Sequence, residues 1–262
     1  MFVSLLISTY NRKEALALSL HSVSAQMVKP DEIVIADDGS QDDTCQLIEQ
    51  FRKKVDIPIV HVWHEDNGFR LSAIRNKAIV AAKGDYIIQI DGDVILNKYF
   101  IADHLELAER GFFVCGSRVG LGPISTRRLL AGYNYTPSFI KQGPKYMFNG
   151  IRSRMLRHYL AKRYAQKNIS RLRGCNMAFW KEDLLRVNGY NEDLTMWGQE
   201  DTEIAYRLIH AGVKKMYLKM GGVQFHLYHA MASNENAAFH SKVLERVIEE
   251  NIDWCENGIL KK

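Results

Sequence analysis

The first 95 residues repeat one pattern of apolar and polar positions. A short apolar run rich in β-branched residues is followed by a polar turn, and then by a segment whose apolar residues recur at helical spacing. The pattern predicts strands at 2–8, 32–36, 58–63 and 86–90, with helices at 13–26, 43–54 and 71–82. Strands that alternate with helices predict an α/β fold, in which a mostly parallel sheet is covered on both faces.

The pattern becomes less regular after residue 95. It predicts a helix at 95–108, a strand at 111–117, loops over 119–150, a strand at 176–180, a loop through Gly189 and Trp197, and a helix at 201–210. A basic helix is expected at 152–173, with apolar residues at 155, 156, 159, 160 and 164. This spacing fits an amphipathic helix on a membrane surface, or a surface helix that buries these residues in the core.

The composition agrees with one large α/β domain or one domain with an appended lobe, because 47% of the 262 residues are hydrophobic and 25% are charged. The longest apolar runs are far shorter than the roughly 20 residues of a membrane span, and the N-terminus lacks the order of a signal peptide. We therefore expect a cytoplasmic protein. Cys45, Cys115, Cys175 and Cys255 are too widely spaced for a zinc or redox motif and are expected to be reduced thiols.

The charge is distributed unevenly along the chain. Between Arg110 and Lys181 there are fifteen Lys or Arg and no Asp or Glu, although the net charge of the whole chain is only +5. This uneven distribution of charge gives information about binding partners rather than about the fold. The basic stretch is either a solvated surface or a face turned toward anionic lipid headgroups or a phosphate-bearing acceptor.

Polar residues follow each of the four predicted strands. They are Thr9-Tyr10-Asn11-Arg12, Asp37-Asp38-Gly39-Ser40, Asp66-Asn67-Gly68 and Asp91-Gly92-Asp93. Such residues are common in ordinary turns. However, ligands of open α/β sheets bind beyond the carboxyl ends of the strands, so one crevice is expected to collect all four groups.

The Asp91-Gly92-Asp93 turn is suited to a divalent cation. Its glycine lets the chain turn sharply while two carboxylates emerge from the end of an apolar strand. Mg²⁺ or Mn²⁺ takes one or two such carboxylates and completes its shell with phosphate oxygens and water. The first strand is followed neither by a dinucleotide-binding glycine motif nor by a P-loop. Thr9 and Asn11 instead suit a base or ribose, and Asp38 can accept from the imide N–H of uracil.

A second acidic group, Trp197-Gly198-Gln199-Glu200-Asp201, stands at the start of a predicted helix. Asp201 is either a helix cap or a general base, and Trp197 offers a flat surface for a sugar ring.

Together these motifs resemble inverting glycosyltransferases of family 2, which have the GT-A fold. The N-terminal resemblance rests on Ser8 to Arg12, Ile35 to Ser40, Asp66 to Phe69, Ala73 to Asn76 and Asp91 to Asp93. The C-terminal half is similar to the galactosyltransferase-type module of bacterial chondroitin polymerases and β-1,4-galactosyltransferases, through Gly174-Cys175-Asn176, Gly189-Tyr190 and Trp197 to Asp201. The resemblance covers about residues 1–115 and 172–232, and the basic segment 120–170 matches nothing in the family pattern.

The resemblance implies a role for each matched residue. The donor-binding residues would be Thr9, Tyr10, Asn11, Arg12, Asp38, Asn67, Arg75, Asp91 and Gly92. Trp197, Gly198 and Glu200 would bind the acceptor, and Asp201 would be the catalytic base. Asp93 and His226, with His229 as the alternate, would hold Mn²⁺ or Mg²⁺. The family's second glycine before the acidic pair is replaced by Gln199, which puts the acceptor pocket in doubt.

These implications predict one GT-A catalytic domain with a C-terminal acceptor-binding lobe. Residues 1–118 would bind the nucleotide-sugar, 119–171 would be a basic insertion, 172–232 the acceptor and catalytic half, and 233–262 a helical tail. The chain would transfer a sugar from a UDP-sugar to a hydroxyl of a glycan or lipid-linked oligosaccharide, in lipopolysaccharide or surface polysaccharide synthesis. Residues 110–181 would contact an anionic membrane on its inner face, and no nucleic acid is expected.

Two other functions compete with this one. A sugar nucleotidyltransferase also uses a Rossmann-like sheet and acidic metal ligands, but it would need a glycine-rich loop after the first strand, which Ser8 to Arg12 lacks. A non-catalytic module could use the basic stretch to bind a polyanion.

Overall fold

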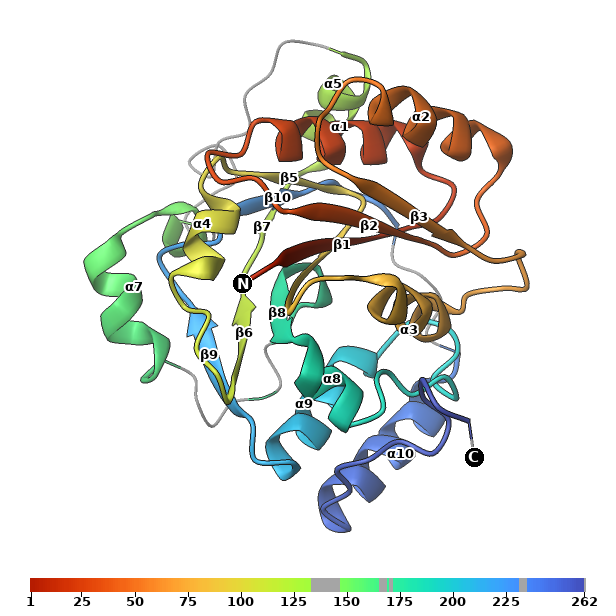
Figure 1. The fold of residues 1–262 in the computed structure, drawn as a ribbon, viewed down its shortest axis with the longest axis vertical. Helices are drawn as coiled ribbons and strands as arrows, with labels where there is room; N and C mark the ends of the chain where they lie inside the picture. The colour runs from red at the N-terminus through yellow and green to blue at the C-terminus, as the bar shows by residue number, and fades with distance from the viewer. Residues whose placement is uncertain (133–146, 165–168, 170–171, 231–234, 262) are drawn as a thin grey trace.

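The computed structural model describes residues 1–262 except 133–146, 165–168, 170–171, 231–234 and 262. A seven-stranded sheet in the order β3-β2-β1-β4-β8-β6-β9 forms its centre (Figure 1). These strands are, in chain order, β1 Val3–Thr9, β2 Glu32–Asp37, β3 Ile59–Trp63, β4 Tyr86–Asp91, β6 Phe112–Gly116, β8 Met177–Trp180 and β9 Lys214–Leu218. Only β8 runs against its neighbours β4 and β6. The predicted mostly parallel sheet is therefore confirmed.

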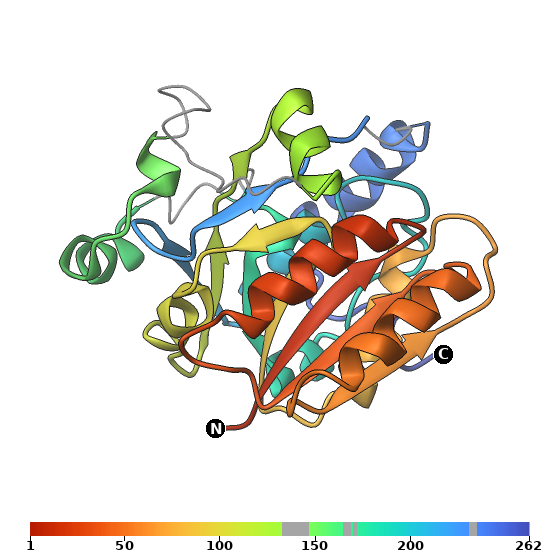
Figure 2. The ribbon, with the colours of Figure 1, turned by 90° about the horizontal axis from the view of Figure 1, so that it is seen from above.

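Helices cover both faces of this sheet, as Figures 1 and 2 show. The helices of the described residues are α1 Lys13–Ser24, α2 Asp42–Arg52, α3 Leu71–Ala81, α4 Phe100–Leu105, α5 Pro123–Leu130, α6 Met147–Gly150, α7 Arg154–Ala161, α8 Lys181–Arg186, α9 Glu200–His210 and α10 Ala237–Glu249, with a 3₁₀ turn η4 at Gly174–Asn176. In the first three βα units, every strand and helix begins and ends within two residues of its predicted position.

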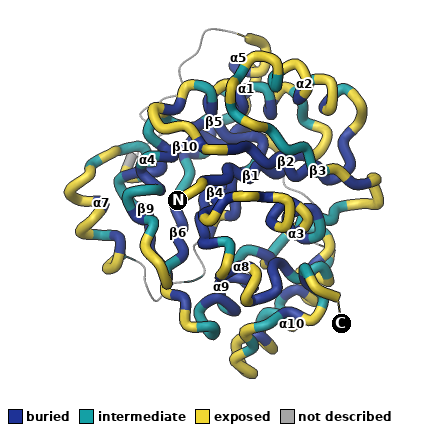
Figure 3. Tube along the Cα trace, viewed as in Figure 1, coloured by how far each residue is buried: buried dark blue, intermediate teal, exposed yellow. Residues whose placement is uncertain are grey.

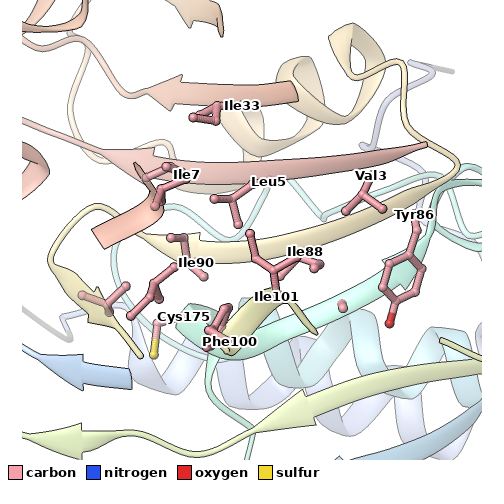
Figure 4. Packing of buried hydrophobic residues seen from close by; sticks show 14 of the residues in the cluster. Val3, Leu5, Ile7, Ile33, Tyr86, Ile88, Ile90, Phe100, Ile101 and Cys175 are labelled. Atoms are coloured by element: carbon pink, nitrogen blue, oxygen red, sulfur yellow. The ribbon is translucent and has the colours of Figure 1, made fainter. Parts of the chain in front are cut away.

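The central strands are apolar on both faces because both are buried. In β1, Leu5 and Ile7 pack with residues of α1, α2 and α4 in one cluster, whereas Leu6 packs with residues of α3, α8 and α9 in another. Figure 4 shows Leu5 and Ile7 beside Ile88 and Ile90 of β4 in the first cluster. Successive residues of a strand point to opposite faces, so an unbroken apolar run matches a sheet covered twice.

A second, three-stranded sheet joins distant parts of the chain. It consists of β5 Val94–Leu96, β10 Gln224–His226 and β7 Val119–Gly120, in the order β5-β10-β7. The antiparallel register sets His226 opposite Val94, and the Leu227 N–H donates to the Asp93 carbonyl at 2.9 Å. The sheet therefore ties residue 226 to the turn that ends β4.

The structure corrects four sequence predictions. The predicted helix 95–108 is observed only over Phe100–Leu105, because Val94–Leu96 form the strand β5 and pair with β10. The segment 119–150 was expected to consist of loops, but its described part contains β7, α5 and α6. Pro123 stands in the first turn of α5, where a missing N–H costs nothing and a fixed φ favours a helix start. The predicted loop after β8 begins with α8, whose first turn carries Glu182 and Asp183. The predicted helix 152–173 is observed over Arg154–Ala161, while 165–168 and 170–171 lie outside the described residues.

Helix α7 is attached to the domain by its buried arginine and by Ala161 at its C-terminal end, which joins the main apolar cluster. The Arg157 guanidinium, fully buried, pairs with Asp103 at 2.9 Å and with Glu106 at 2.6 Å. Met155 and Tyr159 instead remain 79% and 60% exposed, and Figure 3 shows much of this helix as exposed. The alternative in which these two residues join the core is therefore wrong.

Acidic residues outside the basic stretch neutralise part of its charge. Ion pairs join Arg110 to Glu182, Arg152 to Asp103, and Lys162 to Glu109. The local surplus of positive charge is consequently smaller than the sequence count suggests. Among the helices that the structure describes, none combines the length and apolar character needed to cross a bilayer.

Candidate active site

The carboxyl ends of β1, β2 and β4 meet closely, as the sequence predicted. The Asp38 N–H donates to the Thr9 carbonyl at 3.0 Å, and the Gly92 N–H donates to the Ser8 carbonyl at 2.7 Å. A Cβ on Gly92 would lie 3.0 Å from that Ser8 oxygen, which is closer than an ordinary contact. Glycine therefore lets the Asp91-Gly92-Asp93 turn pack directly against the end of β1.

The Asn11 side chain and backbone tie the β1–α1 loop to the loop after β2. The Asn11 N–H donates to Ser40 Oγ at 2.9 Å, and Asn11 Oδ1 accepts from the Gln41 N–H at 2.9 Å. Asn11 has a φ of 45°, in the left-handed region that asparagine tolerates better than most residues. Hydrogen bonds thus join the two loops that carry the residues predicted to bind the nucleotide-sugar donor.

Asp38 is buried and held by two groups that sequence reasoning did not assign. Its Oδ1 lies 2.6 Å from His64 Nε2, and its Oδ2 accepts from the Arg70 N–H at 2.9 Å. Burial raises the pKa of the Asp38 carboxyl, although these hydrogen bonds oppose the rise. Each oxygen keeps one further acceptor position, so contact with a uracil imide stays a prediction.

The turn after β3 is more open. The exposed Tyr10 hydroxyl donates to Asp66 Oδ2 at 2.8 Å, which joins this turn to the β1–α1 loop. Asn67 is exposed at the tip of the turn. A Cβ on Gly39 would lie only 2.6 Å from the Asp66 Cα, so this turn packs against the residue that follows Asp38.

Asp93, His226 and His229 form a cluster with the composition of a metal site. One ligand atom from each lies within 4.8 Å of the others. His226 Nε2 is 3.4 Å from Asp93 Oδ1, and His229 Nε2 is 3.3 Å from Asp93 Oδ2. The structure therefore brings together both histidines that the sequence proposed as alternatives.

The histidine tautomers favour a cation between these groups. The Nδ1 atoms of His226 and His229 each lie within 2.8 Å of a backbone carbonyl, which can only accept, so Nδ1 carries the proton. Burial lowers the pKa of His226 to about 4, so this ring is neutral at pH 7. Its Nε2 lone pair then faces the lone pairs of Asp93 Oδ1. That oxygen is buried and has no hydrogen-bond partner among the described residues. A cation would satisfy both atoms, so the residues fit a divalent metal.

Arg12 already contacts the other oxygen of the same carboxylate. Its guanidinium donates to Asp93 Oδ2 at 2.6 Å, and its side chain is 34% exposed. Since His229 faces this occupied oxygen and His226 faces the unpartnered one, His226 is the better placed of the two candidate ligands.

Arg75 occupies the centre of a second acidic cluster. This fully buried side chain donates to Asp91 Oδ1 at 3.3 Å, to Asp201 Oδ1 at 3.0 Å and to Ser8 Oγ at 3.2 Å. Burial raises the pKa of the Asp91 carboxyl to about 6, with the positive charge of Arg75 opposing the shift. Arg75 therefore holds the carboxylate of Asp91, predicted to bind the sugar donor, next to that of Asp201, the predicted base.

Asp201 can approach Arg75 because the residue packed against its carboxylate is a glycine, Gly174. A Cβ on Gly174 would lie only 2.1 Å from Asp201 Oδ2. The neighbouring Glu200 is buried, and burial followed by the negative charge of Asp201 raises the pKa of its carboxyl to about 7. The Asp201 side chain is still 20% exposed, which leaves it open to a ligand.

The loop before α9 has a left-handed backbone at three of its four residues. Met196, Gly198 and Gln199 have φ values of 68°, 125° and 69°. This explains why a glycine suits position 199, since a side chain there costs conformational energy. Trp197, between them, is 47% exposed, and the Gly198 N–H donates to Glu200 Oε2 at 3.0 Å.

Arg118 is a further site residue that sequence reasoning missed. It follows β6, donates to Cys175 Sγ at 3.8 Å and interacts electrostatically with Asp91 and Asp93. In the sequence, Arg118 stands out only as one positive charge of the basic stretch. Its position directly after the predicted strand 111–117 is the signal that could have identified it as a site residue.

Two protein-family models match the chain. The model of the family "Glycosyl transferase family 2" matches residues 4–186, and that of the "N-terminal domain of galactosyltransferase" matches residues 154–230. The chain is 30% identical over 233 residues to a chondroitin synthase of Escherichia coli, covering 80% of this chain and 32% of that protein. A chondroitin synthase of Pasteurella multocida is 26% identical over 281 residues, with 98% of this chain and 28% of that protein covered. The chain thus spans about a third or less of the length of these relatives.

Solved structures show the same fold. Staphylococcus aureus TarS 1–349 in complex with UDP has a TM-score of 0.67 at 20% identity, covering 98% of this chain and 68% of that one. A mannosyltransferase of Pyrobaculum calidifontis in complex with GDP-Man and Mn²⁺ has a TM-score of 0.62 at 18% identity, covering 91% and 59%. The fold is that of the GT-A glycosyltransferases. The chain belongs to glycosyl transferase family 2.

Proposed function

We propose that this protein transfers a sugar from a UDP-sugar to a hydroxyl of a glycan or glycolipid, with inversion and with a divalent metal. The observation that carries the proposal is the pair of acidic centres at one end of the sheet. Asp93 stands with two histidines, while Asp91 and Asp201 share Arg75. A transferase needs one centre for the departing diphosphate and another for the attacking hydroxyl. The solved relative named in complex with UDP supports the choice of nucleotide.

Asp93 and His226 would hold the metal, Mn²⁺ or Mg²⁺, with His229 as the alternate ligand. A bound metal supplies positive charge that stabilises the departing diphosphate. The loops that carry Thr9, Asn11 and Asp38 would bind the uridine, with Tyr10 and Asn67 at their edge. Arg12, which contacts Asp93, and Gly92, which packs against Ser8 and Thr9, would bind the donor beside the metal ligands.

Asp201 would act as the base. Arg75 fixes its Oδ1, so the carboxylate is oriented before the acceptor arrives. It would take the proton of the acceptor hydroxyl while that oxygen attacks the anomeric carbon and the bond to the diphosphate breaks. A single displacement inverts the configuration, so an α-linked donor yields a β-linked product. Trp197, Gly198 and Glu200 would position the acceptor sugar.

The two functional halves of the chain would be 1–118 and 172–232, with 119–171 as a basic insertion and 233–262 as a tail. The pairing of β4 with β8 supports one catalytic domain, because it joins the halves within the same sheet.

A role in lipopolysaccharide or surface polysaccharide synthesis would bring the protein to the inner face of the membrane. Exposed Met155 and Tyr159 on α7, beside exposed Arg154, support peripheral contact with anionic lipid. Sedimentation with phosphatidylglycerol vesicles, but not with phosphatidylcholine vesicles, is the expected result. Equal recovery with both would contradict this part.

The central experiment is a thermal melt with UDP and Mn²⁺, followed by a screen of UDP-sugars for hydrolysis without acceptor. Stabilisation by UDP that depends on Mn²⁺ is expected. No stabilisation by UDP, together with no hydrolysis of any UDP-sugar, would overturn the proposal. Aryl glycosides then serve as acceptor probes, and the configuration of the product tests inversion.

A further inference from the structure

Helix α10 contacts the loop that carries Trp197, although it lies beyond both family matches. Those matches end at residues 186 and 230, whereas α10 spans Ala237–Glu249. Helix α10 packs against α9, the helix that begins with Glu200 and Asp201. Its position relative to the acceptor side is therefore a property of this chain that the family pattern does not describe.

The contact is made through Thr195, whose carbonyl and hydroxyl oxygens both accept hydrogen bonds. His240 Nε2 lies 2.9 Å from the Thr195 carbonyl oxygen, and Asn236 Nδ2 donates to the same oxygen at 3.3 Å. A carbonyl only accepts, so Nε2 of His240 carries a proton and donates it. His240 of α10 and Asn236 at its N-cap thus hold the residue that precedes the loop.

This loop needs a restraint because its backbone is strained. Three of the four residues between Thr195 and Glu200 have positive φ, and two of these three, Met196 and Gln199, are not glycine. Left-handed backbone at such residues persists only when the surroundings enforce it. The loop is also held by hydrogen bonds from the Met196 N–H to the Phe69 carbonyl at 3.4 Å, from the Gly198 N–H to Glu200 Oε2 at 3.0 Å and from the Glu203 N–H to the Gln199 carbonyl at 2.8 Å. The hydrogen bond from His240, at 2.9 Å, is shorter than the contact with Phe69 and ties the residue before the loop to a separate helix.

Burial of His240 leaves one of its ring nitrogens without a hydrogen bond to any described residue, which is energetically unfavourable. Its ring is 1% exposed, and Nδ1 is buried without a partner among the described residues. A Cβ on Gly198 would lie 3.8 Å from this Nδ1, so the ring stands directly behind the loop. Within the described part of the chain, the buried His240 ring thus has a hydrogen-bond partner only at Nε2. We explain the cost of the unpartnered Nδ1 by the hydrogen bond that Nε2 makes to the Thr195 carbonyl, because this bond restrains the loop.

We propose that His240 is a positioning residue that fixes the loop 196–199, and through it Trp197 and Glu200, for binding of the acceptor sugar. The inference rests on the proposed function, because it deepens the role given to Trp197 and Glu200. It assigns selection and orientation of the acceptor in part to α10.

Hydrogen exchange of the full chain tests the restraint without any ligand. His240→Leu removes the hydrogen bond but keeps an apolar side chain, and we expect the amides of 195–200 to exchange about tenfold faster. His240→Gln retains a donor and should restore protection. His210→Leu is the matched control, because His210 Nδ1 lies 2.9 Å from the Ile252 carbonyl, away from the loop. Asn236→Ala should give a smaller increase and replaces His240→Leu if that variant does not fold. Unchanged exchange of 195–200 in the variants of residues 236 and 240 would overturn the proposal.

Activity separates acceptor positioning from general damage. For His240→Leu we expect hydrolysis of the UDP-sugar by water to stay within about twofold, and transfer to aryl glycosides to fall about tenfold through KM. An equal loss of both rates would contradict a role toward the acceptor. If the unmodified protein neither binds UDP nor hydrolyses UDP-sugars, the proposed function fails, and the exchange comparison still decides whether α10 restrains the loop.

Discussion

Arg75 and Asp201 form an ion pair at 3.0 Å across 126 positions of sequence, with the arginine side chain 1% exposed. The same guanidinium reaches Asp91 at the end of β4. The pair therefore aligns the residue proposed as base with the Asp91 carboxylate, which is proposed to bind the donor.

Replacing Arg75 by Lys should lower kcat by about 100-fold, because an ammonium cannot hold Asp91, Asp201 and Ser8 with one planar group. Replacement by Met should in addition lower the free energy of unfolding by about 2 kcal/mol, since it removes the buried cation that pairs with the partly buried carboxylates of Asp91 and Asp201. Steady-state kinetics and urea unfolding measure the two effects. A Lys variant with full turnover would show that the alignment is unnecessary.

Replacing Asp201 by Asn should reduce transfer by roughly 10²- to 10⁴-fold, because the amide cannot accept the acceptor proton. The thermal shift produced by UDP and Mn²⁺ should be retained. Asp193→Asn, in the exposed loop preceding Trp197, is the control and should leave transfer unchanged. Normal transfer by the Asp201 variant would remove this residue from the mechanism.

Replacing His226 by Ala should weaken Mn²⁺ binding by at least about tenfold, and His229→Ala should have a smaller effect. The reason is that His226 faces the unpartnered Asp93 Oδ1, whereas His229 faces the oxygen already bound by Arg12. Calorimetric titration with MnCl₂ in the presence of UDP measures the affinities, with the exposed His21→Ala as control. A larger loss for His229 would reverse the ligand assignment.

Glu200 should make the protein less stable as pH rises. The pKa of its carboxyl is about 7 in the folded chain and near 4.5 without the fold, so the folded state binds the extra proton between these values. The contribution is fully present below about pH 4.5 and is lost as pH rises through 7. Urea unfolding from pH 5 to 8 should show this decline, and Glu200→Gln should flatten it. Glu245→Gln, an exposed change on α10, should leave the slope unchanged.

Replacing Gln199 by Gly should raise the free energy of unfolding by about 1 kcal/mol, because glycine adopts a φ of 69° without steric cost. The same change at Gln50, inside α2, should lower it by a similar amount. Thermal or urea unfolding of the two variants gives opposite signs if the backbone explanation holds.

The sequence by itself determined the repeated strand and helix units of the first 95 residues and the polar turns that end β1, β2 and β4. Local periodicity and the chemistry of turns encode these features, and the N-terminal family motifs, including Asp91 and Asp93, lie within them. Asp201 stands outside them, in the acidic group at the start of the predicted helix 201–210.

Tertiary structure decided how these residues meet. The three-residue strands β5 and β10 pair across about 130 positions and set His226 beside Asp93, and strands so short carry no periodic signal. Arg75 joins Asp91 to Asp201 because the two halves share one sheet. The left-handed backbone at Gln199 and the contact of His240 with Thr195 likewise arise from packing between distant segments, which local sequence patterns do not record.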